Sequence, residues 1–327
     1  MTKNSALRRH IALTLVALLL LFSVGCQPEP AETVAPPRTP TSSLPEFLRG
    51  PAPAQMRIMC YNVNWDSIFP DDDPQNHPYR IADLSAPFRR MLRAVRPDVV
   101  ALQEIGTQRD PQSVADILDA ELPLPDGARW HAHGGYDNVI ASRWPISMRA
   151  DQRVHEERSV QRGHAMGLID LPDGNFPKDL YLINAHFKSA GGDINIALRQ
   201  HHADALVEWI GDLKTPGGKA DLPEGTPFMV VGDLNVYDTD PAYHLTTLIT
   251  GDIVNTDKFG PSLKPDWDGT NLTDALPTHN AQGALTYTWR DDSEDFDPGA
   301  LDRILYSDSV LAVEHSSGGI ILKEGAF

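Results

Sequence analysis

The sequence predicts an α/β fold in which β-sheets are covered by helices. Short apolar segments typical of strands alternate along the chain with segments whose apolar residues recur at helical spacing. Many of the predicted strands are apolar throughout, which indicates sheets that are buried on both faces. Layers of helices packed on sheets satisfy that requirement. The 327 residues are enough for one such domain to bury a large core without disulfides.

The predicted elements follow one another without an internal repeat or a second linker. The first is a strand at residues 56–62 (MRIMCYN), and the next is an amphipathic helix at residues 81–95 that ends before Pro97. A second strand follows at residues 98–103. We therefore expect one domain over residues 55–327. Its other predicted elements are a long helix at about 194–213 and strands at 138–142, 165–171, 180–184, 227–231, 286–289 and 301–306.

The N-terminal region has the features of an export signal followed by a spacer. Three basic residues precede an apolar run at residues 11–22, which is short for a membrane span but suits the core of a signal peptide. The small residues before Cys26 (SVGC) resemble the bacterial lipobox, so we expect residues 1–26 to be a lipoprotein-type signal peptide with Cys26 lipidated. An ordinary cleaved signal and a single-span anchor are the alternatives. Residues 27–54 are rich in Pro, Ser and Thr and are expected to form an extended linker.

That interpretation predicts an exported lipoprotein, anchored in the membrane and facing the periplasm or the cell surface.

The net charge of the chain disfavours tight, non-specific binding of nucleic acids. The chain carries 45 acidic and 28 basic residues, which gives a formal charge of −17. Such a surface repels polyanions, whereas proteins that bind nucleic acids tightly usually carry a basic face. Chemistry on a phosphodiester stays compatible, because bound divalent cations change the local field.

Polar side chains at the ends of buried strands form the most informative pattern. In layered α/β folds these strand ends line the ligand cleft. Carboxylate and amide oxygens are hard ligands that suit Mg²⁺, Mn²⁺ or Ca²⁺, and the sequence has no Cys/His cluster at zinc spacing. Six polar residues lie where a predicted strand begins or ends: Asn62, Glu104, His186, Asp233, Asn235 and Asp302.

Seven short segments carry a more specific signal through their order: MCYNVNW, LQEI, NVIASRWPI, LINAHFKS, VVGDLNV, TYTW and LDRILYS. Between Met56 and about Tyr306 this ordered set resembles the endonuclease/exonuclease/phosphatase superfamily. That superfamily includes pancreatic-type deoxyribonucleases, abasic-site endonucleases, neutral sphingomyelinases and inositol-polyphosphate 5-phosphatases. The resemblance implies a four-layered αββα sandwich, in which two packed mixed β-sheets are flanked by helices. It places the active site at one edge of the paired sheets.

The resemblance also implies a metal site and its chemistry. Glu104 is implied as a metal ligand, helped by Asn62, with Mg²⁺ as the expected cofactor and Mn²⁺ or Ca²⁺ as alternatives. Attack on a phosphodiester needs an activated water, neutralisation of charge on the phosphate oxygens and help for the leaving oxygen. A carboxylate, a metal ion and a cluster of hydrogen-bond donors supply these three needs.

Four further residues receive roles from the same resemblance. Asp233 is implied to orient or deprotonate the attacking water. Asn235 is implied to hold one non-bridging phosphate oxygen, and His186 to donate to another as charge builds in the transition state. Asp302 is implied to pair with a histidine late in the sequence and to fix its tautomer.

The sequence departs from the family pattern after Asp302. The family typically ends its domain with a Ser-Asp-His-x-Pro block whose histidine is a main catalytic group, and this block is missing. His315 is the histidine that follows Asp302, and it lies inside an apparent strand. Three explanations stay open: the sequence lacks the C-terminal end of the domain, as we expect; His315 substitutes for the missing histidine; or the protein has lost full catalytic competence.

The predicted function is divalent-metal-dependent hydrolysis of phosphate esters by an activated water, with phosphodiesters preferred. A nuclease is slightly preferred over a lipid phosphodiesterase or a phosphatase, so the substrate is expected to be a nucleic acid, a phospholipid head group or a small phosphodiester. Inositol-phosphate phosphatases need several basic side chains in the cleft, and only Lys188 and Arg199 lie near a motif. The alternative is a non-catalytic, surface-anchored binding module on the same fold. We expect a monomer in either case.

Overall fold

Two β-sheets pack face to face in the computed structural model, which describes residues 55–153, 163–237, 243–276, 286–290 and 297–309. The first sheet has four strands in the order β1-β2-β4-β3, namely β1 (Ile58–Asn62), β2 (Val99–Gln103), β4 (Asn138–Ser142) and β3 (His131–Gly135). The second has six strands in the order β5-β6-β7-β8-β10-β9, namely β5 (Ile146–Arg153), β6 (Gly163–Ile169), β7 (Leu180–His186), β8 (Phe228–Asp233), β10 (Asp302–Tyr306) and β9 (Thr273–Asp274). The predicted signal peptide, Cys26 and the predicted linker lie outside the described residues.

Both sheets are mixed, as the resemblance implies. In the first sheet β1 and β2 run parallel, whereas β4 is antiparallel to both of its neighbours. In the second sheet β7 and β8 run parallel, and the other pairings are antiparallel. Each sheet therefore has one pair of parallel strands whose carboxyl ends meet at the same edge.

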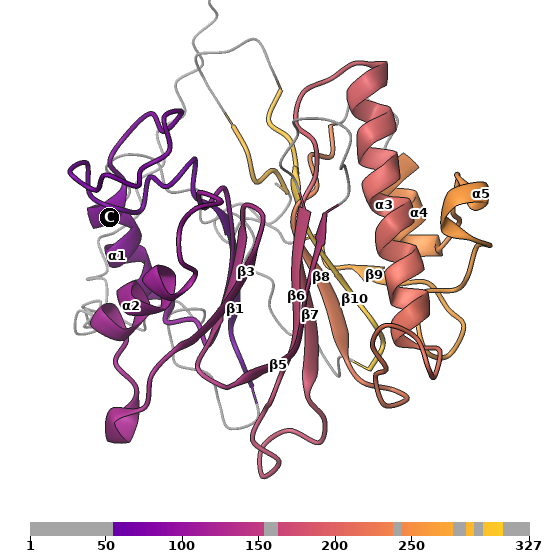
Figure 1. The fold of residues 1–327 in the computed structure, drawn as a ribbon, viewed down its shortest axis with the longest axis horizontal. Helices are drawn as coiled ribbons and strands as arrows, with labels where there is room; N and C mark the ends of the chain where they lie inside the picture. The colour runs from indigo at the N-terminus through magenta and orange to yellow at the C-terminus, as the bar shows by residue number, and fades with distance from the viewer. Residues whose placement is uncertain (1–54, 154–162, 238–242, 277–285, 291–296, 310–327) are drawn as a thin grey trace, which may run out of the picture. The chain divides into compact units, whose positions relative to one another are not determined.

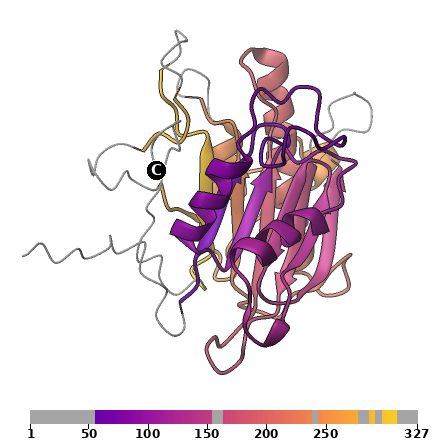
Figure 2. The same ribbon diagram turned by 90° about the vertical axis from the view of Figure 1, so that its left-hand side faces the viewer.

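Helices cover the outer face of each sheet, so the fold has four layers. On the first sheet lie α1 (Ser85–Val95) and α2 (Gln112–Glu121), and a short 3₁₀ turn at Pro125–Gly127 follows them. On the second sheet lie α3 (Asp193–Leu213), α4 (Tyr243–Thr250) and α5 (Thr256–Phe259). Figure 2 shows α1 and α2 in front of the first sheet when that side faces the viewer. The predicted αββα sandwich is confirmed.

Three separate apolar cores explain why the strands are apolar throughout. One core lies between the two sheets, one joins the first sheet to α1 and α2, and one joins the second sheet to α3 and α4. In β2, Val99 and Ala101 contribute to the core between the sheets, whereas Val100 and Leu102 contribute to the core under the helices. Since successive strand residues point to opposite faces, a strand with a core on each face needs apolar residues at every position.

Two predicted elements differ from the structure. The predicted helix at residues 81–95 begins only at Ser85, whose backbone N–H donates to the Asp83 carboxylate at 2.9 Å. Ile81, the first apolar residue of the predicted periodicity, is 83% exposed, so it does not belong to the buried helix face. The predicted strand at residues 286–289 is an isolated bridge between Trp289 and Gly299.

None of the helices in the described part of the chain combines the length and the apolar character needed to cross a bilayer.

A buried histidine lies where α4 packs on the second sheet. His244 is 2% exposed, and its ring centroid lies 5.9 Å from that of Phe187. Burial, and next the charge of Arg199, lower the pKa of His244 to about 4, although a hydrogen bond with the backbone of Leu234 opposes the shift. The folded protein therefore keeps this side chain neutral at pH values where an unfolded chain would protonate it.

His244 should make the protein less stable in mild acid. Between its ordinary pKa near 6.5 and its folded pKa of about 4, the unfolded state binds a proton that the folded state does not bind, so stability falls as pH falls through this window. Relative to His244→Gln, the wild type should lose about 2 kcal/mol more between about pH 7.5 and about pH 5. Urea unfolding of both proteins at the two pH values measures this, and equal losses would contradict it.

Candidate active site

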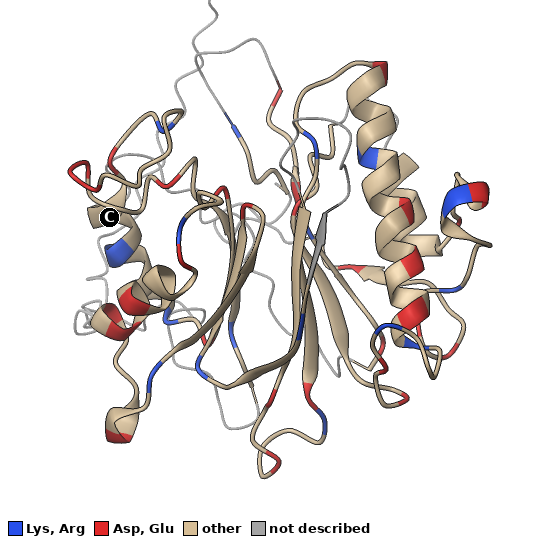
Figure 3. Cartoon of the chain, in the orientation of Figure 1, with Lys and Arg blue, Asp and Glu red and all other residues tan. Residues whose placement is uncertain are grey.

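The predicted polar residues come together at one edge of the two sheets. Asn62 is the last residue of β1, and Glu104 directly follows β2, the parallel partner of β1. His186 and Asp233 end the parallel strands β7 and β8 and lie opposite each other in register. Asp302 begins the antiparallel strand β10 and lies opposite Asp233. Acidic residues accordingly lie at the upper ends of both sheets in Figure 3.

Side chains from both sheets converge on His186, which is fully buried. Its Nε2 atom lies 3.8 Å from Oε1 of Glu104, which belongs to the first sheet. The same Nε2 lies 3.8 Å from Oδ2 of Asp233, on the neighbouring strand of its own sheet. A hydrogen bond of 3.0 Å from Asn62 Nδ2 to Asp233 Oδ2 also joins the two sheets. These contacts bring two carboxylates, an imidazole and an amide into one site.

Asp137 holds the other nitrogen of His186 and was missed by the sequence analysis. Its Oδ2 lies 2.7 Å from His186 Nδ1, and its Oδ1 accepts a hydrogen bond of 3.1 Å from Asn138 Nδ2. A carboxylate at Nδ1 fixes the ring orientation and directs Nε2 into the site. The position could have been found, because Asp137 directly precedes a strand that is antiparallel to β2. The beginning of such a strand lies at the same edge as the end of its partner.

Asp233 is held in one orientation by its neighbours. Its Oδ1 accepts a hydrogen bond of 3.0 Å from the backbone N–H of Asn235, and its Oδ2 accepts the one from Asn62. Gly232 allows the close approach of β8 to β7 at this point, since it has a φ of +145°. A Cβ atom there would lie 1.8 Å from the carbonyl oxygen of Ala185. A glycine before Asp233 is therefore required for this carboxylate to lie beside His186.

Asn235 is part of a polar network behind the site. It has a φ of +50°, and its Nδ2 donates to the carbonyl oxygen of Phe187 at 3.1 Å. The Tyr237 hydroxyl donates to Asn235 Oδ1 at 2.9 Å and accepts from the backbone N–H of Ala190 at 3.2 Å. The guanidinium of Arg199 lies 5.2 Å from the centroid of the Tyr237 ring. Both ends of the Asn235 amide are thus oriented by hydrogen bonds.

Arg199, one of the two basic residues that lie near a motif, does not face a cleft. Arg199 is fully buried on α3, where Nη1 donates to the carbonyl oxygens of Lys188 and Ala190 at 3.0 and 2.8 Å. It therefore stabilises the loop after β7 rather than facing a substrate. The Lys188 ammonium donates to the carbonyl oxygen of Ser189 at 2.8 Å.

Asp302 experiences the charge of the site. Burial, and next the negative charge of Asp233, raise the pKa of Asp302 to about 7, while a hydrogen bond with Thr288 opposes the shift. Two facing carboxylates cannot both ionise without a cost, which is the physical origin of the second contribution. Asp302 was predicted to pair with a late histidine, and His315, the possible substitute for it, lies outside the described residues, so this role of Asp302 stays a prediction.

The donor set fits a hard divalent cation. Glu104 has a left-handed backbone, with a φ of +64°, and its Oε2 accepts a hydrogen bond of 3.1 Å from the backbone N–H of Trp65. Glu104 Oε1 and Asp233 Oδ2 each lie 3.8 Å from His186 Nε2, and carboxylate oxygens are the ligands that Mg²⁺ or Mn²⁺ favours. Asn62 Oδ1, the atom that could bind a metal ion, accepts a hydrogen bond of 3.0 Å from the backbone N–H of Asn64. The predicted help of Asn62 in metal binding therefore stays a prediction.

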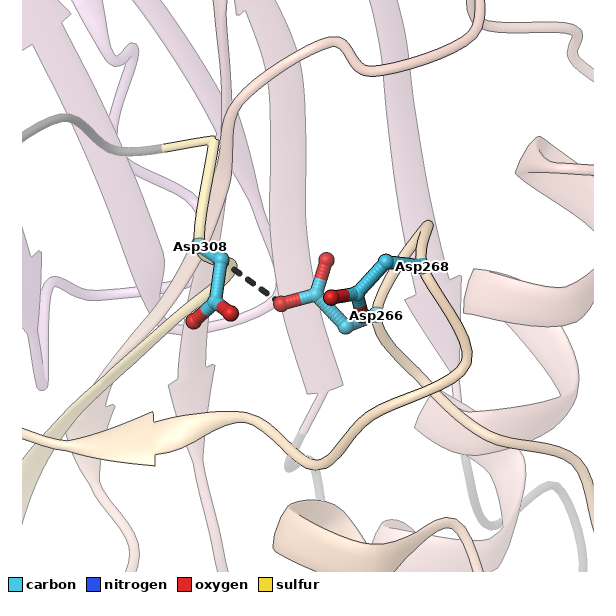
Figure 4. Close-up of side chains that lie close together, drawn as sticks. All are labelled: Asp266, Asp268 and Asp308. Atoms are coloured by element: carbon cyan, nitrogen blue, oxygen red, sulfur yellow. Dashed lines mark hydrogen bonds between the residues drawn. The ribbon is translucent and has the colours of Figure 1, made fainter.

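A second group of carboxylates lies elsewhere in the fold. Asp266, Asp268 and Asp308 bring three carboxylate oxygens within 4.8 Å of one another (Figure 4). Asp308 follows β10, where the Ser307 N–H donates to the carbonyl oxygen of Phe228, the first residue of β8. This group therefore lies at the opposite end of the second sheet from the predicted site.

Contacts within the loop account for that second group. Asp266, its one buried member, accepts from the backbone N–H groups of Asp308 and Trp267 at 2.7 and 2.6 Å. The Lys214 ammonium donates to the carbonyl oxygen of Asp266 and supplies a positive charge nearby. Asp268 accepts two hydrogen bonds from Thr270. The carboxylates are close enough to hold a cation, but their hydrogen bonds already explain their position.

Comparison with known proteins identifies the family. Residues 59–321 match the model of the Endonuclease/Exonuclease/phosphatase family, which is most of the chain. No curated protein sequence gives a significant match.

Several solved structures are similar to the chain at low sequence identity. A β-hairpin deletion mutant of beta toxin from Staphylococcus aureus is 14% identical, with 83% of this chain and 93% of that chain covered and a TM-score of 0.49. Truncated Caenorhabditis elegans TDP2 is 14% identical, with 77% and 84% covered and a TM-score of 0.48. An endonuclease/exonuclease/phosphatase from Beutenbergia cavernae DSM 12333 is 17% identical, with 77% and 64% covered and a TM-score of 0.46.

The contact between Asp137 and His186 can be tested by removing the charge and keeping the shape. Asp137→Asn removes the negative charge beside Nδ1 and replaces one of two acceptor oxygens by an amide N–H, which cannot accept from both His186 Nδ1 and Asn138 Nδ2, so the imidazole is held less firmly. We expect kcat for phosphoester hydrolysis to fall by at least about tenfold, with a smaller change in KM. Asp110→Asn, on an exposed loop, is the matched control. Unchanged kcat in Asp137→Asn would show that this contact is structural only.

Proposed function

The chain belongs to the endonuclease/exonuclease/phosphatase family, and from this premise we propose that it is a divalent-metal-dependent phosphodiesterase. Membership of the family supports metal-dependent hydrolysis of phosphoesters in general. The observation that carries the proposal is the convergence of Glu104 and Asp233 on Nε2 of His186, at 3.8 Å each. A site of this composition can bind a cation, position a water and donate to a phosphate oxygen.

Asp233 is the group that we assign to the attacking water. Its carboxylate is held on both sides, by the Asn235 N–H and by the Asn62 amide, and it is 8% exposed. A carboxylate fixed in this way can accept a proton from water or hold the water in line with the phosphorus. Because both hydrogen bonds are made before substrate binds, no reorganisation is needed during the reaction.

His186 is the donor to the phosphate. The Asp137 carboxylate can only accept, so Nδ1 carries a proton and Nε2 faces Glu104 and Asp233. Donation from Nε2 to a phosphate requires the ring to hold a second proton, as the imidazolium. A non-bridging phosphate oxygen there would gain a hydrogen bond as its negative charge increases in the transition state. Asn235 is assigned to the other non-bridging oxygen. Its amide is oriented by Phe187 and Tyr237, so its orientation is fixed by the fold.

Glu104 is the residue that we assign to the cation, with Asn62 as its helper and Mg²⁺ as the preferred ion. A bound divalent cation polarises the phosphate and neutralises part of its charge. The hydrogen bond from Trp65 N–H to Glu104 Oε2 holds the carboxylate in place for this role. Mn²⁺ and Ca²⁺ are the alternative ions.

We prefer a nuclease over a lipid phosphodiesterase or a phosphatase, and we propose that the protein acts outside the cytoplasm. The proposed location follows from the sequence before residue 55, with Cys26 as the lipid attachment site and the enzyme as a monomer at the membrane surface. The competing proposal is a non-catalytic, surface-anchored binding module. Such a module would keep the fold without turnover.

Hydrolysis of bis-(p-nitrophenyl) phosphate separates the two proposals. The full chain should show turnover with Mg²⁺ or Mn²⁺ and none with EDTA. Asp233→Ala should lower kcat by about 100-fold or more, because the water loses its orienting carboxylate. Asp268→Ala removes an exposed carboxylate at the other end of the same sheet and should leave kcat unchanged. A folded wild type without metal-dependent turnover would favour the binding module.

Glu104 is tested through the dependence on metal concentration. Glu104→Gln keeps an oxygen that can accept from Trp65 N–H but removes the negative charge that attracts the cation. Stimulation by Mg²⁺ should be lost, or should need a concentration at least about tenfold higher. A Glu104→Gln enzyme with the same Mg²⁺ dependence as the wild type would remove Glu104 from the metal site.

A further inference from the structure

The segment between β1 and α1 carries three aromatic rings close to the site. The rings of Trp65 and His77 are stacked, with centroids 4.2 Å apart and an interplanar angle of 21°. The Tyr79 ring lies 6.1 Å from that of Trp65 and 5.2 Å from that of His77. Trp65 and His77 are half-buried, whereas Tyr79 is 70% exposed. We call Trp65, His77 and Tyr79 the aromatic platform.

The backbone at Trp65, the first residue of the platform, contacts the residues assigned to the metal. The Trp65 N–H donates to Glu104 Oε2 at 3.1 Å, and the Asn64 N–H donates to Asn62 Oδ1 at 3.0 Å. The next N–H, of Asp66, donates to the Glu104 carbonyl oxygen at 2.9 Å. Asn64, Trp65 and Asp66 have φ values of +53°, +51° and +63°. Three successive non-glycine residues in the left-handed region are unfavourable, and such backbone is concentrated at functional sites.

Buried contacts hold the segment in place, although it has no regular secondary structure. The Asp66 carboxylate is fully buried and accepts from the Gly106 N–H at 2.8 Å and from Arg109 Nε at 3.1 Å. The Arg109 guanidinium lies 3.6 Å from the centroid of the Phe69 ring and donates to Asp73 at 2.9 Å. The rings are therefore presented from a rigid support, which lowers the entropy cost of binding a ligand on them.

Two acidic residues of the segment are paired with arginines. Asp73 pairs with Arg109 at 2.9 Å, and Asp71 pairs with Arg80 at 3.0 Å. These pairs reduce the repulsion that an acidic loop would exert on a phosphate. The chain as a whole still has a formal charge of −17, which disfavours recognition of a long polyanionic backbone. Recognition through a neutral planar group avoids that penalty.

We propose that the aromatic platform stacks a nucleobase adjacent to the scissile phosphate, which makes nucleotide phosphodiesters with an unpaired base the substrate class. This inference rests on the proposed phosphodiesterase function. Bases stack on aromatic side chains with little sequence preference, because every base has a planar face. A quaternary ammonium head group is held best by several ring faces that surround it, as in an aromatic cage. Trp65 and His77, stacked at 4.2 Å, leave no gap between them, so the base is the better occupant.

Binding of two ligands that differ only in the base tests the platform. Thymidine 5′-monophosphate and 2-deoxyribose 5-phosphate share the sugar and the phosphate, and isothermal titration calorimetry of the full chain with Mg²⁺ gives both Kd values. The wild type should bind the nucleotide about five- to tenfold more tightly. Tyr79→Ala and His77→Ala should bring the two Kd values close together, whereas Tyr79→Phe should keep the difference. The preference should persist at high salt, because the base is uncharged.

Ile81→Ala is the matched control, because Ile81 is 83% exposed two residues from Tyr79 and is not part of the platform. It should keep the wild-type preference. Equal Kd values in the wild type, or a preference that survives Tyr79→Ala, would overturn the proposal. Tighter binding of phosphocholine than of the nucleotide would overturn it in favour of a lipid head group. Neither ligand needs to be hydrolysed, so a base preference without turnover would reject the phosphodiesterase and keep the platform.

Discussion

A buried polar contact between the two sheets fixes the distance across which the site is built. Asn184 of β7 is fully buried, and its Nδ2 donates to the carbonyl oxygens of Leu102 and Val139 in the other sheet at 2.9 and 3.0 Å. Its Oδ1 accepts from Gln103 Nε2 at 2.7 Å. Apolar side chains alone would allow the sheets to slide, whereas buried hydrogen bonds are costly to break and specify one arrangement. Asn184 lies two residues before His186, so the same contact sets where the imidazole meets the first sheet.

The position of the site follows from the way in which the two sheets are held together. His186 and Asp233 come from one sheet, while Glu104 and Asp137 come from loops at the edge of the other. Short side chains can meet across this junction only because the strand ends are already held together. The raised pKa of Asp302 reflects the same crowding, since burial and a neighbouring carboxylate both disfavour its charged form. The contact between His186 and Asp137 gives one of the carboxylates in the site a hydrogen-bond partner, which reduces the repulsion among them.

Much of this edge could be predicted from the sequence, because most of its residues directly follow an apolar strand that can be recognised on its own. Apolar strands followed by Asn62, Glu104 and Asp233 show where the chain leaves a sheet, and parallel pairing brings those exits together. Asp137 was missed because it precedes its strand, and only the antiparallel pairing with β2 brings it to the same edge. Proximity to a motif does not show whether a basic side chain faces a cleft, and Arg199 is buried on α3.

Other features depend on contacts between distant segments and have no local signature. Helix α1 begins at Ser85 and not at residue 81, because hydrogen bonds hold the residues before it outside the helix. The Leu84 N–H donates to the Ser67 carbonyl oxygen at 2.7 Å, and the Ser85 N–H donates to the Asp83 carboxylate. The support for the aromatic rings depends on Arg109, which lies more than forty residues beyond Asp66 and donates to it. Propensity and periodicity describe one element at a time, so they could not place that support.

The acidic composition is compatible with a phosphodiester substrate, because the positions of the charged side chains matter more than the net charge at the site. Net charge governs long-range attraction, but the field at a bound phosphate is set by the nearest groups and by any cation among them. Asp71 and Asp73, in the segment between β1 and α1, are paired with arginines, and Asp137 in the site is paired with an imidazole. Glu104, whose carboxylate lies 3.8 Å from His186 Nε2, is the group that we assign to a divalent cation, and such a cation would neutralise part of the local charge. Under the proposed function, the protein would give up electrostatic capture of long polyanions, and the proposed aromatic platform would recognise a neutral base at short range.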